Sequence, residues 1–563
     1  MKRIAVLAII ALGFAGIARS TFRASAMPEA ALSKYIPAGP LLYLEAKDFS
    51  SLLKDWNSST QKQAWVQSDN YEVFSRSRLF LRLKGAGEQF AVAAGLPPDM
   101  DFLSQVAGER SALAVYDIGK LQFLYITYLP SAGAMETTLW QTRAKFEPRN
   151  VSGTSFYLRR DPESQREVAF AVSGDYLLLA TREDLIAGAL QLISGKQDHS
   201  LEREPWWTTS TATAGQPGDL RLVLDIKDLV PNGYFRSYWV QQNITDLSQY
   251  SAAVSDLFRS SKEYREERVL IRSKEPTHDA TPQGTAAVAD LSRLIPDAVG
   301  VYVTVANPTS DSCFELLATK LLAPHSGRTP ASQFAPQVQL TSGGQGDSTD
   351  LETRIDQRTA AAVGTPSGVE LRDLLKNNPV LASLQFQSSQ RDTGGVFVRL
   401  HSAVVLAGAS DWNEASVKSA IVSFVKPELT ASQLGMGWTP KSGYQQFDGL
   451  WPISVSVSGK YLILSNDSTV METVLANFSN KANLKPLELY AGFSHDRERA
   501  NFVRLTGVVD HPNGSSIGER EPQFFSGNMA GLSSVLADIS AEHIEICSEA
   551  GKVRQTVTYE WSR

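Results

Sequence analysis

The chain has 563 residues, of which 43% are hydrophobic and 20% are charged, a composition typical of a globular protein rather than a disordered or fibrous one. One hydrophobic core rarely organises a chain of this length, so we expect roughly two to four domains. The net charge of −6, without a long run of basic residues, argues against nucleic acid as a partner, because phosphate binding needs a basic surface.

The N-terminus has the pattern of a signal peptide. Two basic residues precede the apolar run 4–18, which is too short for a typical membrane span but suits a signal-peptide core. Small residues, Ala-Ser-Ala at 24–26, then follow where a signal peptidase would cleave. We therefore predict a signal peptide over residues 1–26 and a periplasmic or extracellular location. The alternative is an uncleaved segment that anchors the protein to the inner membrane.

Three short motifs raise the question of acyl-transfer chemistry. Ser51 and Lys54 fit S-x-x-K, residues 68–70 fit S-D-N, and residues 441–443 approximate K-T-G. The first two motifs are too close together to leave room for the helical domain that β-lactamase-like enzymes place between them, and the third lies far away in the chain. We interpret Ser50 or Ser51 as the N-cap of a surface helix with a solvated Lys54, and we predict no catalytic residue.

The clearest local pattern occurs twice. Residues 166–196 and 451–481 each predict a strand, a tight glycine turn, a second strand and a helix. We expect Thr181 and Asn466 to be the helix N-caps, and Gly195 and Asn480 to take the left-handed position after each helix. Five apolar positions at helical spacing coincide in the two helices and should be buried in both. They are Leu185, Ile186, Ala189, Leu190 and Ile193 in the first copy and Val470, Met471, Val474, Leu475 and Phe478 in the second.

Two adjacent tryptophans, Trp206 and Trp207, follow the first copy of this pattern. They precede residues 208–219, which are rich in Thr, Gly and Pro and which we expect to form a flexible loop. An exposed aromatic pair beside a loop could bind sugars or partners, whereas packing in the core is the ordinary interpretation. This pair is the candidate binding site that the sequence offers.

The repeated pattern and the segments rich in proline, glycine and polar residues together predict the domain organisation. The polar, proline-containing segment 274–286 predicts a linker, and a stretch rich in Pro, Gly and Ser near 323–350 predicts an inserted loop. We therefore predict two similar domains, 27–273 and 287–563, that arose by internal duplication. Each should be an α+β domain in which helices pack on a largely antiparallel sheet, because a tight hairpin turn returns the strand antiparallel.

Cysteine and histidine usage gives few chemical leads. Cys313 and Cys547 both lie in the second domain, where they could form a disulfide or could be two buried thiols. His543, Glu545 and Cys547 alternate along one strand and would share a face, as zinc ligands can, but their side chains would be spread over about 13 Å. With the isoleucines between them on the opposite, core face, this is more simply the polar side of an amphipathic strand. We predict no metal and no cofactor.

Several segments resemble a known bacterial family. The start of the first domain, "IPAGPLLYLEAKDFSSLLKDW", the segment "AAGLPPDMDFLSQVAGERSALAVYDIG" and the "VSGDYLLLAT" hairpin followed by "HSLEREPWW" are similar to the family called domain of unknown function 3352. The resemblance covers most of the first half and, more weakly, the second. It implies an exported protein, and it brings no activity and no site residue.

Three classes of function remain open. The leading hypothesis is a non-catalytic exported protein of the cell envelope that binds another envelope component, protein or ligand, or serves as a scaffold. The alternatives are an envelope hydrolase with a site at the interface of the two lobes, and a carrier of hydrophobic ligands. Carboxylate pairs or a Ser-His contact in a deep cleft would favour the enzyme, and a large apolar cavity would favour the carrier.

Overall fold

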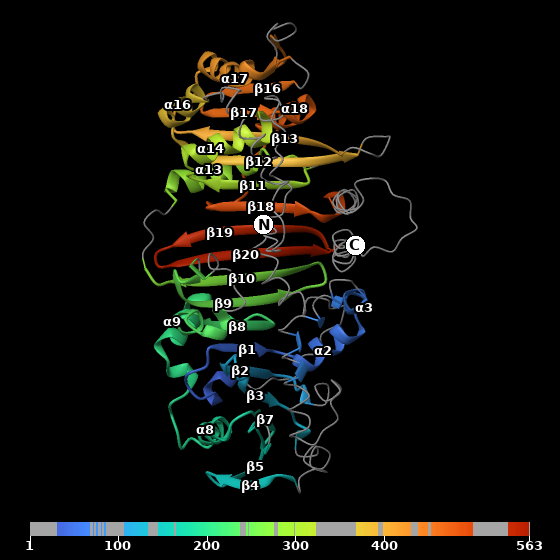
Figure 1. Ribbon diagram of the computed structural model, residues 1–563, viewed down its shortest axis with the longest axis vertical. Helices are drawn as coiled ribbons and strands as arrows, with labels where there is room; N and C mark the ends of the chain where they lie inside the picture. The colour runs from blue at the N-terminus through green and yellow to red at the C-terminus, as the bar shows by residue number, and fades with distance from the viewer. Residues whose placement is uncertain are drawn as a thin grey trace, which may run out of the picture. The chain divides into compact units, whose positions relative to one another are not determined.

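The computed structural model of the chain is drawn in Figure 1. It divides into two compact units, each of which combines helices with an antiparallel sheet, as the predicted α+β class requires. No helix among the described residues is long and apolar enough to cross a membrane. Apart from a few positions within these ranges and short pieces of 71–85 and 244–245, the structure describes residues 31–67, 106–132, 145–236, 247–274, 280–322, 368–391, 398–429, 437–448, 452–498 and 539–561. The predicted signal peptide lies outside these residues.

The first unit, with described residues 31–274, 539–542 and 548–561, is built on one antiparallel sheet. Its strands follow the order β4 (Glu147–Val151), β5 (Thr154–Arg160), β6 (Glu167–Ser173), β7 (Tyr176–Ala180), β3 (Gln122–Tyr128), β2 (Ser111–Asp117), β1 (Leu42–Ala46), β8 (Leu220–Asp225), β9 (Tyr250–Arg259), β10 (Glu263–Arg272) and β20 (Lys552–Trp561). A turn connects β20 to β19 (Ile539–Glu549).

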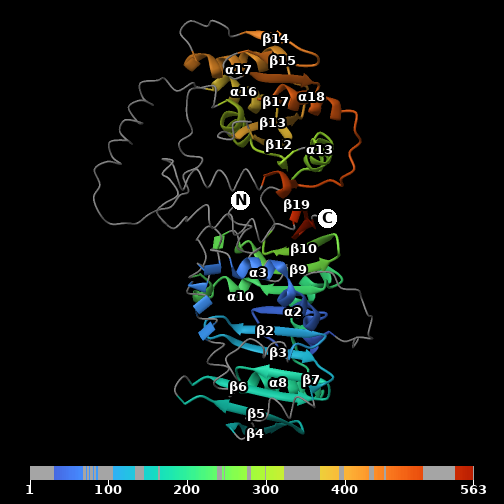
Figure 2. The same ribbon diagram turned by 90° about the vertical axis from the view of Figure 1, so that its right-hand side faces the viewer.

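Helices cover both faces of this sheet. Tyr43 on β1 lies directly opposite Ala114 on β2 and Val223 on β8, so these three side chains share one face, and all three belong to the largest core cluster of the unit. Over that face lie η1 (Leu32–Tyr35), α8 (Glu183–Ile193), η3 (Leu201–Arg203) and α9 (Pro205–Ala214), with α8 across β6 and β7 (Figure 2). Other helices among the described residues of the unit are α2 (Phe49–Ser58), α3 (Thr60–Val66), α10 (Ile226–Leu229) and α11 (Gly233–Arg236).

We call the strands of the second unit, whose described residues are 280–498 and 543–547, the second sheet; the pairings described within it are antiparallel. Its strands follow the order β14 (Trp438–Pro440), β15 (Gln445–Phe447), β16 (Ile453–Ser458), β17 (Tyr461–Ser465), β13 (Val398–Gly408), β12 (Val380–Arg391), β11 (Val301–Ala306) and β18 (Leu489–Ser494).

This second sheet is the middle of three layers. Along β17, Leu462 and Leu464 face one core cluster and Ile463 faces another, because side chains alternate between the faces of a strand. The cluster around Ile463 is covered by α13 (Pro282–Ser292) and α18 (Ser468–Asn477). The other is covered by α14 (Ser310–Leu317), the π-helical turn η4 (Ala318–Leu322), α16 (Val369–Asn377) and α17 (Glu414–Leu429).

The pattern predicted twice forms the expected elements in both places. The order strand, turn, strand, helix is confirmed as β6-β7-α8 and as β16-β17-α18. Gly174 and Gly459 occupy the two turns with φ of 58° and 56°, a conformation that glycine adopts without strain. The buried stripe is confirmed in part in both helices. In α8, Leu185, Ile186, Ala189 and Leu190 are buried and Ile193 is half-buried against the core. In α18, Met471 and Val474 are buried, whereas Val470, Leu475 and Phe478 are half-buried against the core.

The predicted helix ends need correction. The N-caps are Arg182 and Asp467, one residue later than Thr181 and Asn466. The side chains of those two residues instead accept backbone N–H groups of the neighbouring strand, at 2.8 and 2.7 Å, and so end the strand rather than begin the helix. After the helices, Gly195 is left-handed with φ 68°, as predicted, but Asn480 is not.

The boundary between the domains also differs from the prediction. The chain passes from one unit to the other after Thr277, within the predicted linker 274–286. However, α13 already begins at Pro282, because Thr281 caps it and proline suits the first position of a helix. At the other end, β20 pairs with β10 over nine residue pairs, so the C-terminal strand is counted with the first unit rather than the second. The inserted loop predicted near 323–350 lies outside the described residues.

Candidate functional site

The acyl-transfer motif has the structural role that its spacing indicates. Ser51 lies in the first turn of α2 and Lys54 is exposed on the same helix. The N-cap is Asp48, whose carboxylate accepts the Ser51 N–H at 3.0 Å, rather than Ser50 or Ser51. Residues 441–443 form the turn between β14 and β15 in the other unit, and residues 68–70 lie outside the described residues.

The tryptophan pair is part of a helix rather than the start of a loop. Pro205 begins α9, which continues to Ala214 through most of the segment expected to be flexible. Trp207 is buried and its ring meets Tyr43 edge-on at 4.9 Å between centroids. The indole N–H of Trp206 donates to Glu204 at 2.5 Å. Trp207 is therefore a core residue, as the ordinary interpretation of the pair expects, and Trp206 is half-buried and held by a neighbouring side chain.

The two cysteines do not form the disulfide that the sequence allows as one of two alternatives. Cys313 is buried in α14 on one face of the second sheet, and Cys547 packs against the cluster on the opposite face. The sheet itself separates them, which is why two cysteines in one domain fail to meet. Burial raises the pKa of the Cys313 thiol to about 12, so this thiol is protonated and unreactive at neutral pH.

The strand with His543, Glu545 and Cys547 does not form a metal site. The ring Nδ1 of His543 shares a hydrogen bond of 2.9 Å with the hydroxyl of Tyr302. In the described part of the chain, no group of three or more His, Cys, Asp or Glu side chains is placed to hold a metal ion. The intervening isoleucines are half-buried like their polar neighbours, so the strand lacks the division into core and polar faces that we predict.

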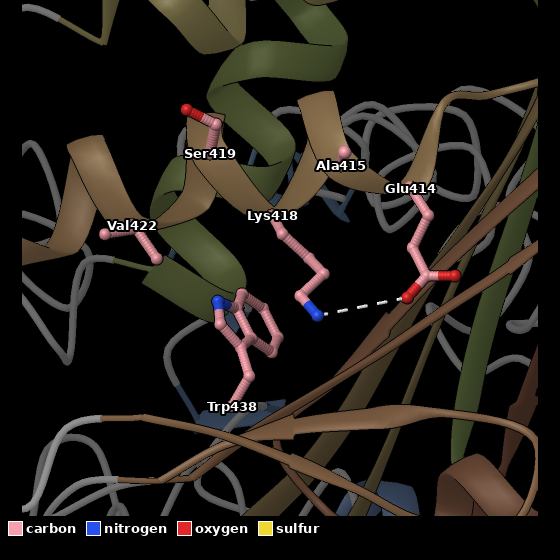
Figure 3. Close-up of a pocket in the computed structure, with 6 residues that line it drawn as sticks. All are labelled: Glu414, Ala415, Lys418, Ser419, Val422 and Trp438. Atoms are coloured by element: carbon pink, nitrogen blue, oxygen red, sulfur yellow. Dashed lines mark ion pairs between the residues drawn. The ribbon is translucent and has the colours of Figure 1, made fainter.

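A shallow pocket of about 590 Å³ lies between helix α17 and β14, the strand at the edge of the second sheet (Figure 3). We call it the α17–β14 pocket. The five helical positions that line it are spaced by one, three, one and three residues and therefore share one face of α17. Trp438 on β14 forms the opposite wall. The lining residues are Glu414, Ala415, Lys418, Ser419, Val422 and Trp438.

The helix presents this face because its other face is needed for the core. Val417, Ile421 and Phe424 of α17 are buried in the cluster beneath it. The helix begins where Asn413 accepts the Ser416 N–H at 2.9 Å, which fixes the first turn that carries Glu414. Core packing and capping therefore set the direction of the lining side chains.

The opposite wall is fixed by the β14–β15 hairpin. Trp438 pairs in register with Phe447, and their rings lie 5.1 Å apart. The ammonium group of Lys418 lies 5.0 Å from the centre of the indole ring and 4.0 Å from a carboxylate oxygen of Glu414. Figure 3 shows Lys418 extending between Glu414 and Trp438. An aromatic ring, an amine and a carboxylate thus converge on one hollow.

These groups can stack against a ligand and form hydrogen bonds or ion pairs with it. The six lining side chains include an aromatic surface, one cation, one anion and one hydroxyl, and none of them is a histidine or a cysteine. The Ser419 hydroxyl donates to the Glu370 carboxylate of α16 at 3.3 Å. Sequence reasoning missed this site because Glu414 and Lys418 have the spacing of an ordinary exposed ion pair, and Trp438 stands alone in its segment.

Comparison with known proteins adds little. No protein-family model matches the chain, and no curated protein sequence matches it. Among solved structures the chain is similar to TP0453. For its crystal form III the identity is 11%, the match covers 46% of this chain and 84% of that one, and the TM-score is 0.24. For form I the values are 10%, 44%, 82% and 0.25. Scores this low do not establish a shared fold, and the resemblance to domain of unknown function 3352 stays a prediction.

Proposed function

We propose that this chain is an exported protein of the cell envelope with two similar lobes, and that it binds another envelope component at the α17–β14 pocket. The observation that carries the binding role is the pocket itself. There, the ammonium group of Lys418 lies 5.0 Å from the centre of the Trp438 indole ring and 4.0 Å from a carboxylate oxygen of Glu414. Such a mixture of one aromatic surface and a few polar groups is typical of ligand sites.

Internal duplication is supported by the strand order. The order β4-β5-β6-β7-β3-β2-β1-β8 of the first unit has a counterpart, strand for strand, in β14-β15-β16-β17-β13-β12-β11-β18. Helices also follow equivalent strands, because α2 and α14 come after β1 and β11, and α8 and α18 come after β7 and β17. An order of eight strands that recurs in one chain is difficult to explain by chance.

Export is supported by the N-terminal sequence and by the resemblance to domain of unknown function 3352, whose members look like exported proteins. The expected consequence is cleavage after Ala26. Mass spectrometry of the protein purified from its host should therefore find Met27 at the N-terminus. Recovery of the uncut chain from membranes would favour the N-terminal anchor instead.

Binding can be tested in the cell by placing a photo-crosslinking amino acid in the pocket. Ser419 is the position of choice because it lines the pocket and is exposed. Thr209, exposed on α9 of the first unit, is the matched control. We expect a covalent adduct from position 419 and none from position 209. Equal labelling at both positions, or none at either, would contradict a specific binding site in the pocket.

A further inference from the structure

We infer that the ligand of the α17–β14 pocket is a neutral saccharide, held by one pyranose ring of a longer glycan. This inference rests on the proposed binding function and assigns its ligand class. The volume of about 590 Å³ lies within the range of about 300–1,000 Å³ that small-molecule sites occupy. Because the hollow is open to solvent, it can hold one or two units of a chain while the rest of the chain continues outside.

The tryptophan supplies a surface on which a sugar can stack. Trp438 is half-buried, and its ring packs 5.1 Å from that of Phe447, its partner across the hairpin. A fixed aromatic ring offers a large contact area at small cost in conformational entropy, and its electron-rich face attracts the weakly positive C–H groups on the flat side of a pyranose. The ammonium group of Lys418, which lies over the ring at 5.0 Å, can turn to a ligand hydroxyl because its side chain is flexible.

The charges of the pocket favour a ligand without net charge. Glu414 and Lys418 oppose each other at 4.0 Å, so the pocket carries one negative and one positive group. An anionic ligand would meet the Glu414 carboxylate, and a cationic ligand would compete with Lys418 for it. Hydroxyl groups both donate and accept hydrogen bonds, so neighbouring hydroxyls of a sugar can satisfy the carboxylate, the ammonium group and Ser419 together.

The geometry of β14 argues against an added peptide strand at this end of the sheet. The bonds from Lys441 N to Tyr444 O and from Asp448 N to Gly437 O, both 2.9 Å, show that residues 437 and 441 point toward β15. By alternation, Trp438 and Pro440 present their backbone to the outer edge. Proline has no N–H to donate, so the outer edge of this three-residue strand is poorly suited to pairing.

The test uses purified full-length mature protein and two soluble probes, the tetramer of N-acetylglucosamine and cellotetraose, with binding followed by titration calorimetry and ligand-observed NMR. We expect saturable binding of at least one probe, and a loss of roughly tenfold or more in affinity on Trp438→Ala. Ala415→Leu, which fills the pocket from the exposed face of α17 without altering the core, should weaken binding similarly. Trp206→Ala in the first unit is the matched control and should leave the affinity unchanged.

The outcomes separate this inference from the proposed function. An adduct at position 419 in cells without binding of either tetrasaccharide would overturn the saccharide assignment and leave the binding role intact. Saccharide binding that survives both Trp438→Ala and Ala415→Leu would show that the sugar is held elsewhere. The absence of both adduct and saccharide binding would contradict the two proposals together.

Discussion

The segments β6-β7-α8 and β16-β17-α18 have the same order of elements and the same glycine turn, yet different side chains hold them in place. In the first, the Thr181 hydroxyl accepts the Phe123 N–H from β3 at 2.8 Å. In the second, the Asn466 amide oxygen accepts the Ser402 N–H from β13 at 2.7 Å. The position of the hydrogen bond is kept while its acceptor differs. The comparison teaches that this fold depends on where backbone groups are satisfied more than on which residue satisfies them.

The contacts of the two helix starts differ in the same way. Directly after Thr181 in the first segment, Arg182 donates to Gln122 at 3.1 Å. Directly after Asn466 in the second segment, Asp467 shares a hydrogen bond of 2.7 Å with His401. Both pairs join the residue before the helix to the strand beside it, and they do so with unrelated chemistry.

The largest expected difference between the segments concerns the helix cores. Leu190 is fully buried in α8, so Leu190→Ala should lower the free energy of unfolding of its unit by about 2–5 kcal/mol. Leu475, at the equivalent place in α18, is half-buried, and Leu475→Ala should cost about half as much. Met471→Ala should lower the stability of the second unit by about as much as Leu190→Ala lowers that of the first, since Met471 is also buried. Denaturant unfolding of the three variants measures these differences, and equal losses at Leu190 and Leu475 would contradict the expectation that the burial of each side chain sets its cost.

The glycine turns should behave alike. Gly174 and Gly459 both have positive φ, so replacing either by alanine should cost about 1–2 kcal/mol through backbone strain. Asp175→Ala, at the neighbouring turn position, is the control and should change stability by less than about 0.5 kcal/mol. Unequal losses at the two glycines would show that only one of the two turns requires the left-handed conformation.

The helix N-termini offer a smaller and more pointed test. The α18 cap is internal, because Asp467 accepts the Val470 N–H at 2.9 Å. The α8 cap is external, because Glu167 on β6 accepts the Glu183 N–H at 2.9 Å and Arg182 provides no cap. Asp467→Ala and Glu167→Ala should each cost about 1 kcal/mol. Adding Arg182→Asp to Glu167→Ala should recover part of the loss, as thermal unfolding would record, and no recovery would contradict the capping role of Glu167.

Local patterns predicted the repeated segment well, because the hairpin and the apolar stripe are encoded within about 30 residues. The N-caps were misplaced by one residue for a reason outside that window. Thr181 and Asn466 bind strands that lie 58 and 64 residues away in the chain. The α17–β14 pocket could not be predicted at all, because Lys418 and Trp438 meet only when core packing brings α17 beside β14. The sequence left the tryptophan pair open between packing and binding, because Tyr43, the residue that Trp207 packs against in the core, is far away in sequence.

The smallest expected effect concerns two equivalent tyrosines. Burial, followed by the neighbouring Tyr35, raises the pKa of Tyr176 from its ordinary value of 10 to about 12. Burial, followed by the hydrogen bond to Asp290, raises the pKa of Tyr461 to about 12 as well. Each folded unit therefore retains a proton that the unfolded chain loses, so each contribution to stability is complete below pH 10 and is lost as the pH rises toward 12.

Tyr176→Phe and Tyr461→Phe should each remove one late-titrating phenol from the ultraviolet titration of the folded protein. They should also flatten the loss of stability over this range. Because the carboxylate acts only on Tyr461, Asp290→Asn should lower the titration midpoint of that tyrosine and leave Tyr176 unchanged, and an equal shift in both would contradict the separate causes inferred for the two tyrosines.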